Sequence, residues 1–576
     1  MARFRVWAPR ADSMSLKLGE RTLPMTAGQR GWWELEAEAA HGSDYAYLIN
    51  GEEPALPDPR SLWQPQGLHG PSRRYDHSRF FWEDERWQAV PLASAVIYEL
   101  HIGAFTPEGT FEAAIPYLDH LADLGITHVE IMPVAEFPGR AGWGYDGAVP
   151  FAVHGAYGGP DGLKAFVNAC HLRGLAVILD VVYNHLGPDG NYLGSFGPYF
   201  TDRYSTPWGE AINFDGRDSD EVRRFFLDNA LMWLRDYHVD GLRLDAVHAI
   251  IDLSAVHFLE ELAEEVDALQ TRLGKYKVLI AESDLNDPRL VRSREAGGYG
   301  LDAQWNDDFR HSLHSILTGE RNGFIGDFGT FADLATALEE TFVYSGRYSR
   351  YRGRRHGRPA GGVPGHRFLG YLQNHDQVGN RARGERSSAL MSEGRLKAAA
   401  ALVLTAPFVP MLFMGEEWGA STPFQYFTDH QNDELAQSVR EGRLQEFADF
   451  GWEPEELPDP QAPETAQNSK LRWEEREREP HAGILAWHRE LIRLRRRLPA
   501  LSAGWFDPVK VYWDEERRWL VMERGALTVA CNLGEGEQVV PWGGARRSEI
   551  LLASDPGIQM KAEGVLLPPD SSAILG

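Results

Sequence analysis

Short apolar segments alternate with helical segments from about Val96 onward, and this rhythm is the feature that most constrains the fold. Eight segments are predicted as buried strands: VIYELHI, THVEIMPV, LAVILDVVYNH, GLRLDAV, YKVLIAES, DAQWNDDF, FLGYLQNHD and VPMLFMGEEWG. Stretches such as PDGLKAFVNACHLRG and DEVRRFFLDNALMWLRDY between them are predicted as helices. Because parallel strands need helical crossovers, eight such units predict a closed (β/α)8 barrel. An open doubly wound sheet is the competing fold, but no glycine-rich phosphate loop follows any strand.

The chain is long enough for more than one domain, since 576 residues exceed what a single core usually serves. Residues 1–90 are predicted to form an amino-terminal β-sandwich, because Met14, Leu16 and Leu18 alternate with polar residues. This sandwich is either a structural cap or a carbohydrate-binding module. Residues 91–500 are predicted to hold the barrel with its loop insertions, and residues 501–576 a carboxyl-terminal β-sandwich.

Two segments between the last barrel strand and the carboxyl-terminal domain are distinctive. The polar, turn-rich TDHQNDELAQSVREGRLQEFADFGWEPEELPDPQAPETAQNSK is predicted as a loop excursion at the barrel rim. The basic HAGILAWHRELIRLRRRLPAL is predicted as a helix whose run of charges forms a solvated face.

Charge and composition exclude several classes of partner. The formal net charge is −26, and so acidic a surface repels nucleic acid and anionic lipid. The amino terminus has no signal-peptide pattern, and no apolar run reaches membrane-spanning length. Cys170 and Cys531 are too few for a disulfide framework and are expected to be buried, unreactive residues. We expect a cytoplasmic monomer that binds neither nucleic acid nor membrane.

Polar side chains follow four of the predicted strands where those strands end. They are Asp180, Asn184, His185, Arg243, Asp245, His248, Glu282, His375 and Asp376. Charges are rarely buried without partners, and the carboxyl ends of barrel strands meet on one face, where active sites are built. The sequence therefore predicts a shared pocket in which these charges satisfy one another.

Glycoside hydrolysis is the chemistry that these acids suit best. It needs an acid to protonate the leaving oxygen and a carboxylate facing the anomeric carbon, roughly 5–5.5 Å apart in retaining enzymes. Asp245 beside Arg243 is expected to stay ionised as a nucleophile. Glu282 after VLIA is expected to hold its proton, because apolar surroundings and nearby carboxylates raise its pKa. A metal site is the rival, but no close His-x-x-x-His or Cys pair is present, so neither metal nor cofactor is expected.

The motifs DVVYNH, GLRLDAVHA, IAES and LQNHDQ resemble, in order, the four short motifs of the α-amylase superfamily. The resemblance implies the catalytic acids: Asp245 as nucleophile, Glu282 as general acid/base and Asp376 as third acid. It also implies that Arg243 orients the nucleophile. Substrate contacts are implied for Asp180, His185, His375 and Tyr145, the last as the stacking aromatic of GWGYDG. Trp208 and the run from Phe424 to Phe427 are further candidates to stack on sugar.

Several longer strings narrow the resemblance within the superfamily. AESDLNDPR, QWNDDFRH, LQNHDQVGNRARGER and LFMGEEWGASTPFQYFTDH are together similar to the trehalohydrolase family, which cuts the α-1,4 bond beside the terminal trehalose of maltooligosyltrehalose. This implies a retaining hydrolase of trehalose biosynthesis with a maltooligosaccharide-type substrate.

Three alternative functions remain open from the sequence. A glycogen branching enzyme usually has Glu after the third acid, where this chain has Gln377. An ordinary α-amylase often has Lys-His after the nucleophile, where this chain has Val247 and His248. A barrel that binds carbohydrate without catalysis should lack one of the acids. Asn184 matches a calcium ligand of many α-amylases, but the trehalohydrolase resemblance implies no calcium.

Overall fold

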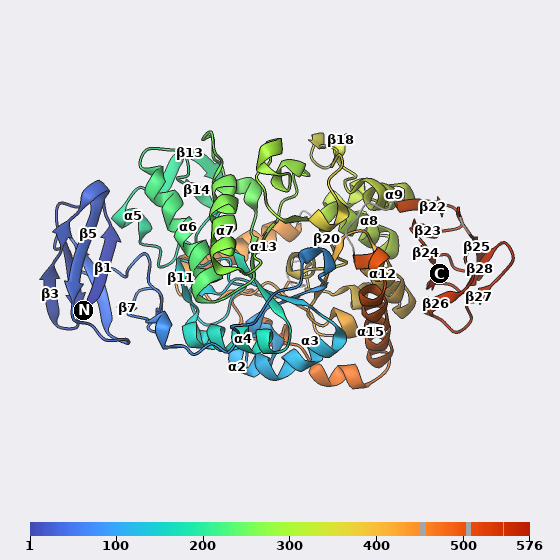
Figure 1. Cartoon of the computed structure of the whole chain (residues 1–576), viewed down its shortest axis with the longest axis horizontal. Coiled ribbons are helices and arrows are strands. Elements are labelled where there is room, and N and C mark those ends of the chain that lie inside the picture. The colour runs from blue at the N-terminus through green and yellow to red at the C-terminus, as the bar shows by residue number, and fades with distance from the viewer. Residues whose placement is uncertain (449–456, 503–508, 545) are drawn as a thin grey trace.

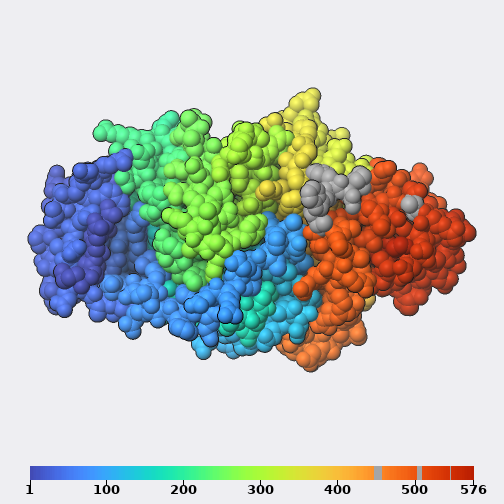
Figure 2. Space-filling model, viewed as in Figure 1, coloured from blue at the N-terminus to red at the C-terminus, as the bar shows by residue number. Residues whose placement is uncertain are grey.

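The computed structural model of the chain describes residues 1–448, 457–502, 509–544 and 546–576. The molecule is elongated (Figure 1 and Figure 2): amino-terminal sheets lie at one end, the barrel in the middle and carboxyl-terminal sheets at the other. The two chain termini therefore lie far apart. Within the described ranges, no helix combines the length and apolar character needed to cross a membrane.

Eight parallel strands close into the central barrel, which confirms the predicted fold class. They are β8 (Ile97–Leu100), β9 (His128–Ile131), β12 (Ala176–Val181), β15 (Gly241–Leu244), β16 (Val278–Ala281), β17 (Ala303–Trp305), β20 (Phe368–Gly370) and β21 (Val409–Phe413). Each strand pairs with the next, and β21 pairs with β8 to close the ring. All eight coincide with the predicted segments, because continuous apolar runs are buried on both faces in such a barrel.

Helices cover the outside of the barrel (Figure 1). The longer ones are α4 (Gly159–Leu172), α6 (Ser219–Asp236), α7 (Phe258–Leu273), α8 (Asp307–Thr318), α9 (Phe331–Glu340), α12 (Glu393–Thr405) and α15 (His481–Arg497). In α6, buried Val222, Phe225 and Phe226 lie at helical spacing. Acidic residues in its first turn stabilise the helix, because negative side chains interact favourably with the positive end of the helix dipole.

Two antiparallel sheets form the amino-terminal end. One contains β1 (Ala2–Trp7), β4 (Thr26–Ala27) and β5 (Trp32–Ala37), and the other β2 (Met14–Leu18), β3 (Arg21–Pro24), β6 (Asp44–Ile49) and β7 (Ser72–Arg73). Met14, Leu16 and Leu18 are buried together, as their alternation predicts.

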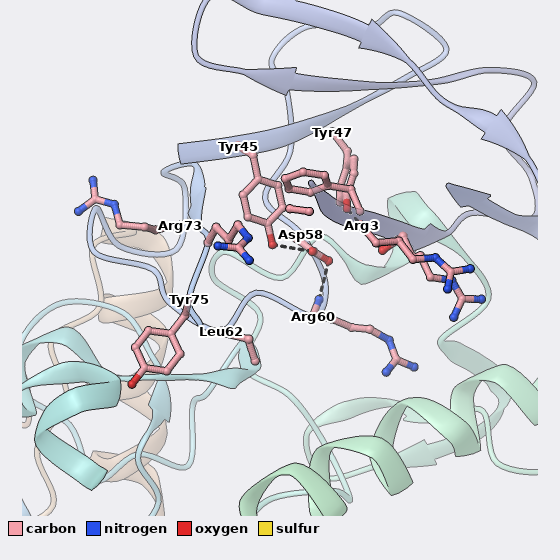
Figure 3. A pocket seen from close by; sticks show the side chains of 12 residues that line it. Arg3, Tyr45, Tyr47, Asp58, Arg60, Leu62, Arg73 and Tyr75 are labelled. Carbon is pink, nitrogen blue, oxygen red and sulfur yellow. Dashed lines mark hydrogen bonds between the residues drawn. The ribbon is translucent and has the colours of Figure 1, made fainter. Parts of the chain in front are cut away.

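A pocket of about 350 Å³ lies beside these sheets (Figure 3). At its centre, the carboxylate of buried Asp58 accepts hydrogen bonds from the Tyr45 hydroxyl and the Arg60 main-chain N–H, each at 2.8 Å. The Arg60 side chain reaches the barrel, where its guanidinium lies 2.8 Å from Asp228 of α6. Arg3 and Arg73 of the same pocket pair with acids of their own sheets. Arg60 therefore attaches this end of the molecule to the barrel, and the charges of Arg3 and Arg73 are paired within the sheets.

The carboxyl-terminal end also has two antiparallel sheets. One contains β22 (Val509–Asp514), β23 (Trp519–Arg524), β24 (Leu527–Asn532), β26 (Ile550–Ala553) and β29 (Ser571–Leu575), and the other β25 (Gln538–Pro541), β27 (Gln559–Met560) and β28 (Gly564–Leu567). The main-chain N–H of Val511 donates to Glu339 of α9 at 2.7 Å, which fastens these sheets to the barrel helices. Residues 503–508, at the start of the predicted domain 501–576, lie outside the described residues.

Two sequence predictions are wrong in detail. The segment predicted as a loop excursion contains two helices, α13 (Asp433–Ala448) and α14 (Pro463–Asn468). Residues 449–456 of the segment lie outside the described residues. In α15, Arg495 is buried rather than solvated. Its guanidinium donates to the main-chain oxygens of Leu404 and Phe408, each at 2.9 Å, and so completes the hydrogen bonding after α12. Cys170 and Cys531 are buried free thiols, as expected.

Candidate active site

Arg243, on β15, is the centre of the charged cluster at the barrel mouth, and none of its surface is exposed. Its Nη1 donates to both carboxylate oxygens of Asp180, at 2.8 and 2.9 Å, and to Asp245 Oδ1 at 2.8 Å. Its Nη2 lies 3.8 Å from Glu282 Oε2. The guanidinium also sits 4.3 Å from the centre of the Trp305 ring. A buried arginine is tolerated here because acids and an aromatic face replace its water.

Asp245 directly follows β15, and three neighbours favour its ionised form. Besides the Arg243 contact, Asn184 Nδ2 donates to its Oδ2 at 2.7 Å. Burial alone would raise the pKa of Asp245, but Arg243, His185 and the Asn184 hydrogen bond outweigh burial and lower the pKa. A carboxylate kept ionised in a buried site can act as a nucleophile.

Glu282 directly follows β16 and has the opposite electrostatic character. Burial raises its pKa to about 8; Arg243 opposes this, while the neighbouring carboxyl of Asp245 adds to it. Its Oε2 accepts the main-chain N–H of Ala246 at 2.6 Å. Ala246 has a left-handed backbone (φ 38°), which is uncommon for a residue other than glycine and is found preferentially at functional sites. Glu282 can therefore hold a proton at neutral pH beside an ionised Asp245.

His375 and Tyr145 extend the cluster on the side of Asp180. The rings of Tyr145 and His375 stack with centroids 5.2 Å apart, and the Tyr145 hydroxyl lies 2.7 Å from His375 Nε2. The same hydroxyl donates to Asp180 Oδ2 at 2.7 Å. Burial raises the pKa of Asp180 to about 7, against the effect of Arg243. Both oxygens of Asp180 are thus occupied by protein donors.

Asp376, the implied third acid, is the second residue of the short helix α10 (His375–Gly379), and 42% of its side chain is exposed. Its Oδ1 lies 3.5 Å from His375 Nε2. Together with Glu282 and His248, it lines a cavity of about 520 Å³ that opens at the barrel mouth. The third acid is therefore the more accessible one, as contact with sugar hydroxyls requires.

His185 and Trp208 form a separate aromatic pair beside the cluster. Trp208 lies in the turn between β13 (Phe200–Thr206) and β14 (Gly209–Ile212), and 47% of it is exposed. Its ring stacks on that of His185, with centroids 4.4 Å apart and planes 4° from parallel. In the run from Phe424 to Phe427, both phenylalanines are buried, so the expectation that they stack on sugar is wrong, whereas Tyr426 between them is half-buried.

Sequence reasoning missed several polar residues inside the barrel. Glu99 on β8 and Glu130 on β9 are register partners and both are buried. Asp307 accepts the Tyr371 hydroxyl at 2.7 Å and lines the same cavity as Glu282. Arg243 is recognisable in the sequence as a charged residue within an apolar strand. The segments VIYELHI and THVEIMPV show the same pattern at Glu99 and Glu130, so this pattern could have identified both acids.

The comparisons with known proteins agree with this geometry. Residues 78–197 match the family described as alpha amylase, catalytic domain, and residues 504–574 match a domain of unknown function, DUF3459. A Salmonella typhimurium protein described as a candidate alpha amylase has a crystal structure with a TM-score of 0.89 and 39% identity, covering 99% of this chain and 97% of that one. The barrel, the acids at its mouth and the catalytic-domain match define a glycoside hydrolase of the α-amylase superfamily.

Two relatives identify the family within that class. The malto-oligosyltrehalose trehalohydrolase of Arthrobacter ramosus is 52% identical over 94% of this chain and 94% of its own length. That of Mycobacterium tuberculosis is 49% identical over 96% of this chain and 95% of its own. The chain belongs to the malto-oligosyltrehalose trehalohydrolase family.

Proposed function

We propose that this enzyme cleaves maltooligosyltrehalose at the α-1,4 bond beside its terminal trehalose, with retention, and releases trehalose as a step of trehalose biosynthesis. The observation that carries the proposal is the electrostatic contrast between two acids around one guanidinium. Arg243 contacts Asp245 at 2.8 Å and Glu282 at 3.8 Å, and the pKa of Asp245 is lowered while that of Glu282 is raised to about 8. An ionised nucleophile and a protonated acid are therefore present at the same pH.

The reaction proceeds by double displacement. The Asp245 carboxylate attacks the anomeric carbon as the glycosidic bond breaks, and Glu282 gives its proton to the departing oxygen of trehalose. Asp245 is then esterified to the maltooligosaccharide. Glu282, now ionised, takes a proton from water, whose oxygen attacks the anomeric carbon and frees the sugar and Asp245.

The remaining residues bind and orient. Asp376, the exposed acid beside His375, accepts sugar hydroxyls, and Trp208 offers an exposed ring to the glucan. Asp180 is buried with both oxygens occupied by Arg243 and Tyr145. Its proposed part in substrate binding is therefore to orient those two side chains rather than to contact the sugar.

The test is incubation with maltooligosyltrehalose and, separately, with amylose. Free trehalose from the first substrate and no new α-1,6 branches in the second is the expected result. New branches without trehalose would instead favour a branching enzyme. Asp245→Asn and Glu282→Gln are expected to lower the rate of trehalose release by at least about 10³-fold, because each acts in the transition state. Near-full hydrolysis by Asp245→Asn would refute the mechanism.

A further inference from the structure

Glu99 reaches across the barrel mouth to His375. It stands on β8, and His375 begins α10 after β20, with β21 between those two strands in the barrel. Glu99 Oε1 lies 2.5 Å from His375 Nδ1, and Oε2 accepts the main-chain N–H of His375 at 3.0 Å. Each of the two residues is only 1% exposed. The catalytic steps above make no use of this contact.

The contact begins a continuous hydrogen-bonded chain that ends at the nucleophile. His375 Nε2 lies 2.7 Å from the Tyr145 hydroxyl, which is 2.7 Å from Asp180 Oδ2. Arg243 Nη1 donates to both Asp180 oxygens and to Asp245 Oδ1. A change in the protons on His375 can therefore reach Arg243 through only two residues.

The number of hydrogens available in this series of hydrogen bonds restricts the protonation state of the His375 ring. Arg243 donates to both oxygens of Asp180, so Asp180 is an acceptor and takes the single hydrogen of the Tyr145 hydroxyl. The Tyr145 oxygen is then an acceptor for His375 Nε2, which must carry a hydrogen. Nδ1 faces Glu99 Oε1, and with Glu99 ionised this nitrogen carries a hydrogen as well. Only the imidazolium has hydrogens on both ring nitrogens.

The charges around the ring agree with this assignment. The ionisable groups that face His375 are Glu99, Glu130, Tyr145, Asp180 and Asp376 as acids, and His101 and Arg243 as bases. Burial alone would lower the pKa of His375, but Asp376 and Glu99 outweigh it and raise the pKa to about 9. Burial, with the charge of Glu99, raises the pKa of Glu130 well above its ordinary value and so favours its neutral form.

We propose that Glu99 is a positioning residue that keeps His375 protonated on both ring nitrogens and so fixes the direction of each hydrogen bond from His375 to Arg243. Where it predicts a rate, this inference rests on the proposed function. The His375 cation then lies beside the exposed Asp376, where the glucan binds, and the Tyr145 hydroxyl is held as a donor to Asp180. Glu99 acts through His375 without touching substrate.

Glu99→Gln is the informative variant, because it keeps the side-chain length and removes the charge. Its His375 should lose a proton at a lower pH than in the parent enzyme, because one of the two acids that raise its pKa is removed while burial still lowers it. The kcat/KM for trehalose release should fall roughly 10²-fold at pH 8 and recover as the pH is lowered and His375 regains its second hydrogen. Glu130→Gln is the matched control, since it makes the same substitution at the register partner of Glu99 on the neighbouring strand, where burial favours the neutral carboxyl. Its pH profile should match that of the parent enzyme.

Nitrogen-15 NMR of the histidine rings in the full chain, without substrate, separates the two proposals. The parent enzyme should show His375 protonated on both nitrogens at pH 8, identified by loss of its signal in His375→Asn, and Glu99→Gln should show it neutral. A neutral His375 in the parent at pH 8 overturns the inference even if Glu99→Gln does not fold. The inference is also overturned if the pH profile of kcat/KM for Glu99→Gln runs parallel to that of the parent at every pH. Neither result would affect the trehalose-release assay that tests the reaction itself.

Discussion

Asn184 binds the proposed nucleophile twice: its Nδ2 donates to the Oδ2 and to the main-chain oxygen of Asp245, each at 2.7 Å. One amide thus fixes both the side chain and the backbone at the end of β15. The lone resemblance of Asn184 to a calcium ligand gave no indication of this contact. In this structure the amide group of Asn184 donates a hydrogen bond directly to the Asp245 carboxylate.

Asn184→Leu should therefore slow the first chemical step. It removes a hydrogen bond to a charged group, worth about 1.5–3 kcal/mol, and so lowers kcat by roughly 10- to 100-fold. Single-turnover trehalose release measures this loss, and thermal melting checks that the fold survives. An unchanged kcat in a folded variant would show that Arg243 alone holds Asp245 in position.

The pH dependence of the reaction should follow Glu282 on its alkaline side. Glu282 must be protonated to act as the acid, and burial raises its pKa to about 8. The kcat/KM for trehalose release should therefore fall as the pH rises through about 8. On the acid side the rate should persist well below neutrality, because the pKa of Asp245 is lowered and its carboxylate stays ionised. An alkaline limb centred near the ordinary carboxylate range would contradict this assignment.

Asp307→Asn should move that alkaline limb to lower pH. Asp307 lines the same cavity as Glu282, and its charge is among the causes that raise the pKa of Glu282. Burial raises the pKa of Asp307 to about 6, so it is ionised over the range in which Glu282 titrates. Removing this like charge eases the ionisation of Glu282. The kcat/KM profile measures the shift, and a limb that stays in place or moves upward would show that Asp307 does not act on Glu282.

The barrel and its acids were predictable because both signals are local. Apolar runs separated by helical segments identify β12, β15 and β16 without any knowledge of contacts. Polar residues at the ends of such runs, Asp245 and Glu282 among them, must then meet on one face once the barrel closes. The directions of the pKa shifts of these two acids agree with expectations from Arg243 beside Asp245 and the apolar VLIA before Glu282, although His185, Asn184 and Asp307 also contribute.

The contacts that organise the site were not predictable, because they join residues distant in sequence. Glu99 and His375 are 276 positions apart and meet only because β8 and β20 lie on one closed barrel. The stacking of Trp208 on His185 depends on how a loop hairpin folds back. Arg495 belongs to a run of charges that was predicted to be solvated. Its burial is explained only by its hydrogen bonds to main-chain oxygens at and just after the end of α12.

Trp208→Ala should weaken substrate binding more than it affects chemistry. The ring is 47% exposed beside the mouth and makes no hydrogen bond to the acids. Aromatic contacts of this kind contribute about 0.5–1.5 kcal/mol, which predicts a rise in KM of roughly 2- to 10-fold with kcat nearly unchanged. Trp513→Ala is the matched control, because that tryptophan is 39% exposed but lies on β22 in the carboxyl-terminal sheets. Equal effects of the two variants on KM would exclude Trp208 from the binding surface.

A buried ion network joins the linker after the amino-terminal sheets to the barrel. His171 of α4 contacts Asp84 through Nδ1 at 2.7 Å and Asp240 through Nε2 at 3.0 Å, and all three are buried. The ring of Trp87 stacks on His171 at 4.6 Å. Burial alone would lower the pKa of His171, but Asp240 and Asp84 outweigh it and raise the pKa. The same contacts lower the pKa of both aspartates against the effect of burial.

These shifts predict how the free energy of unfolding depends on pH. Because the pKa of His171 is higher in the folded than in the unfolded chain, its contribution is complete below about pH 6.5 and is lost as the pH rises through the raised folded value. The aspartates contribute above about pH 4 and lose their contribution as the pH falls through their lowered values. His171→Gln leaves two buried carboxylates without this cation, so it should destabilise the fold by about 3–5 kcal/mol near pH 5 and remove the alkaline slope. Denaturant unfolding from pH 5 to 9 measures both effects, with the exposed His69→Gln as the control. A slope that persists in His171→Gln would assign it to other groups.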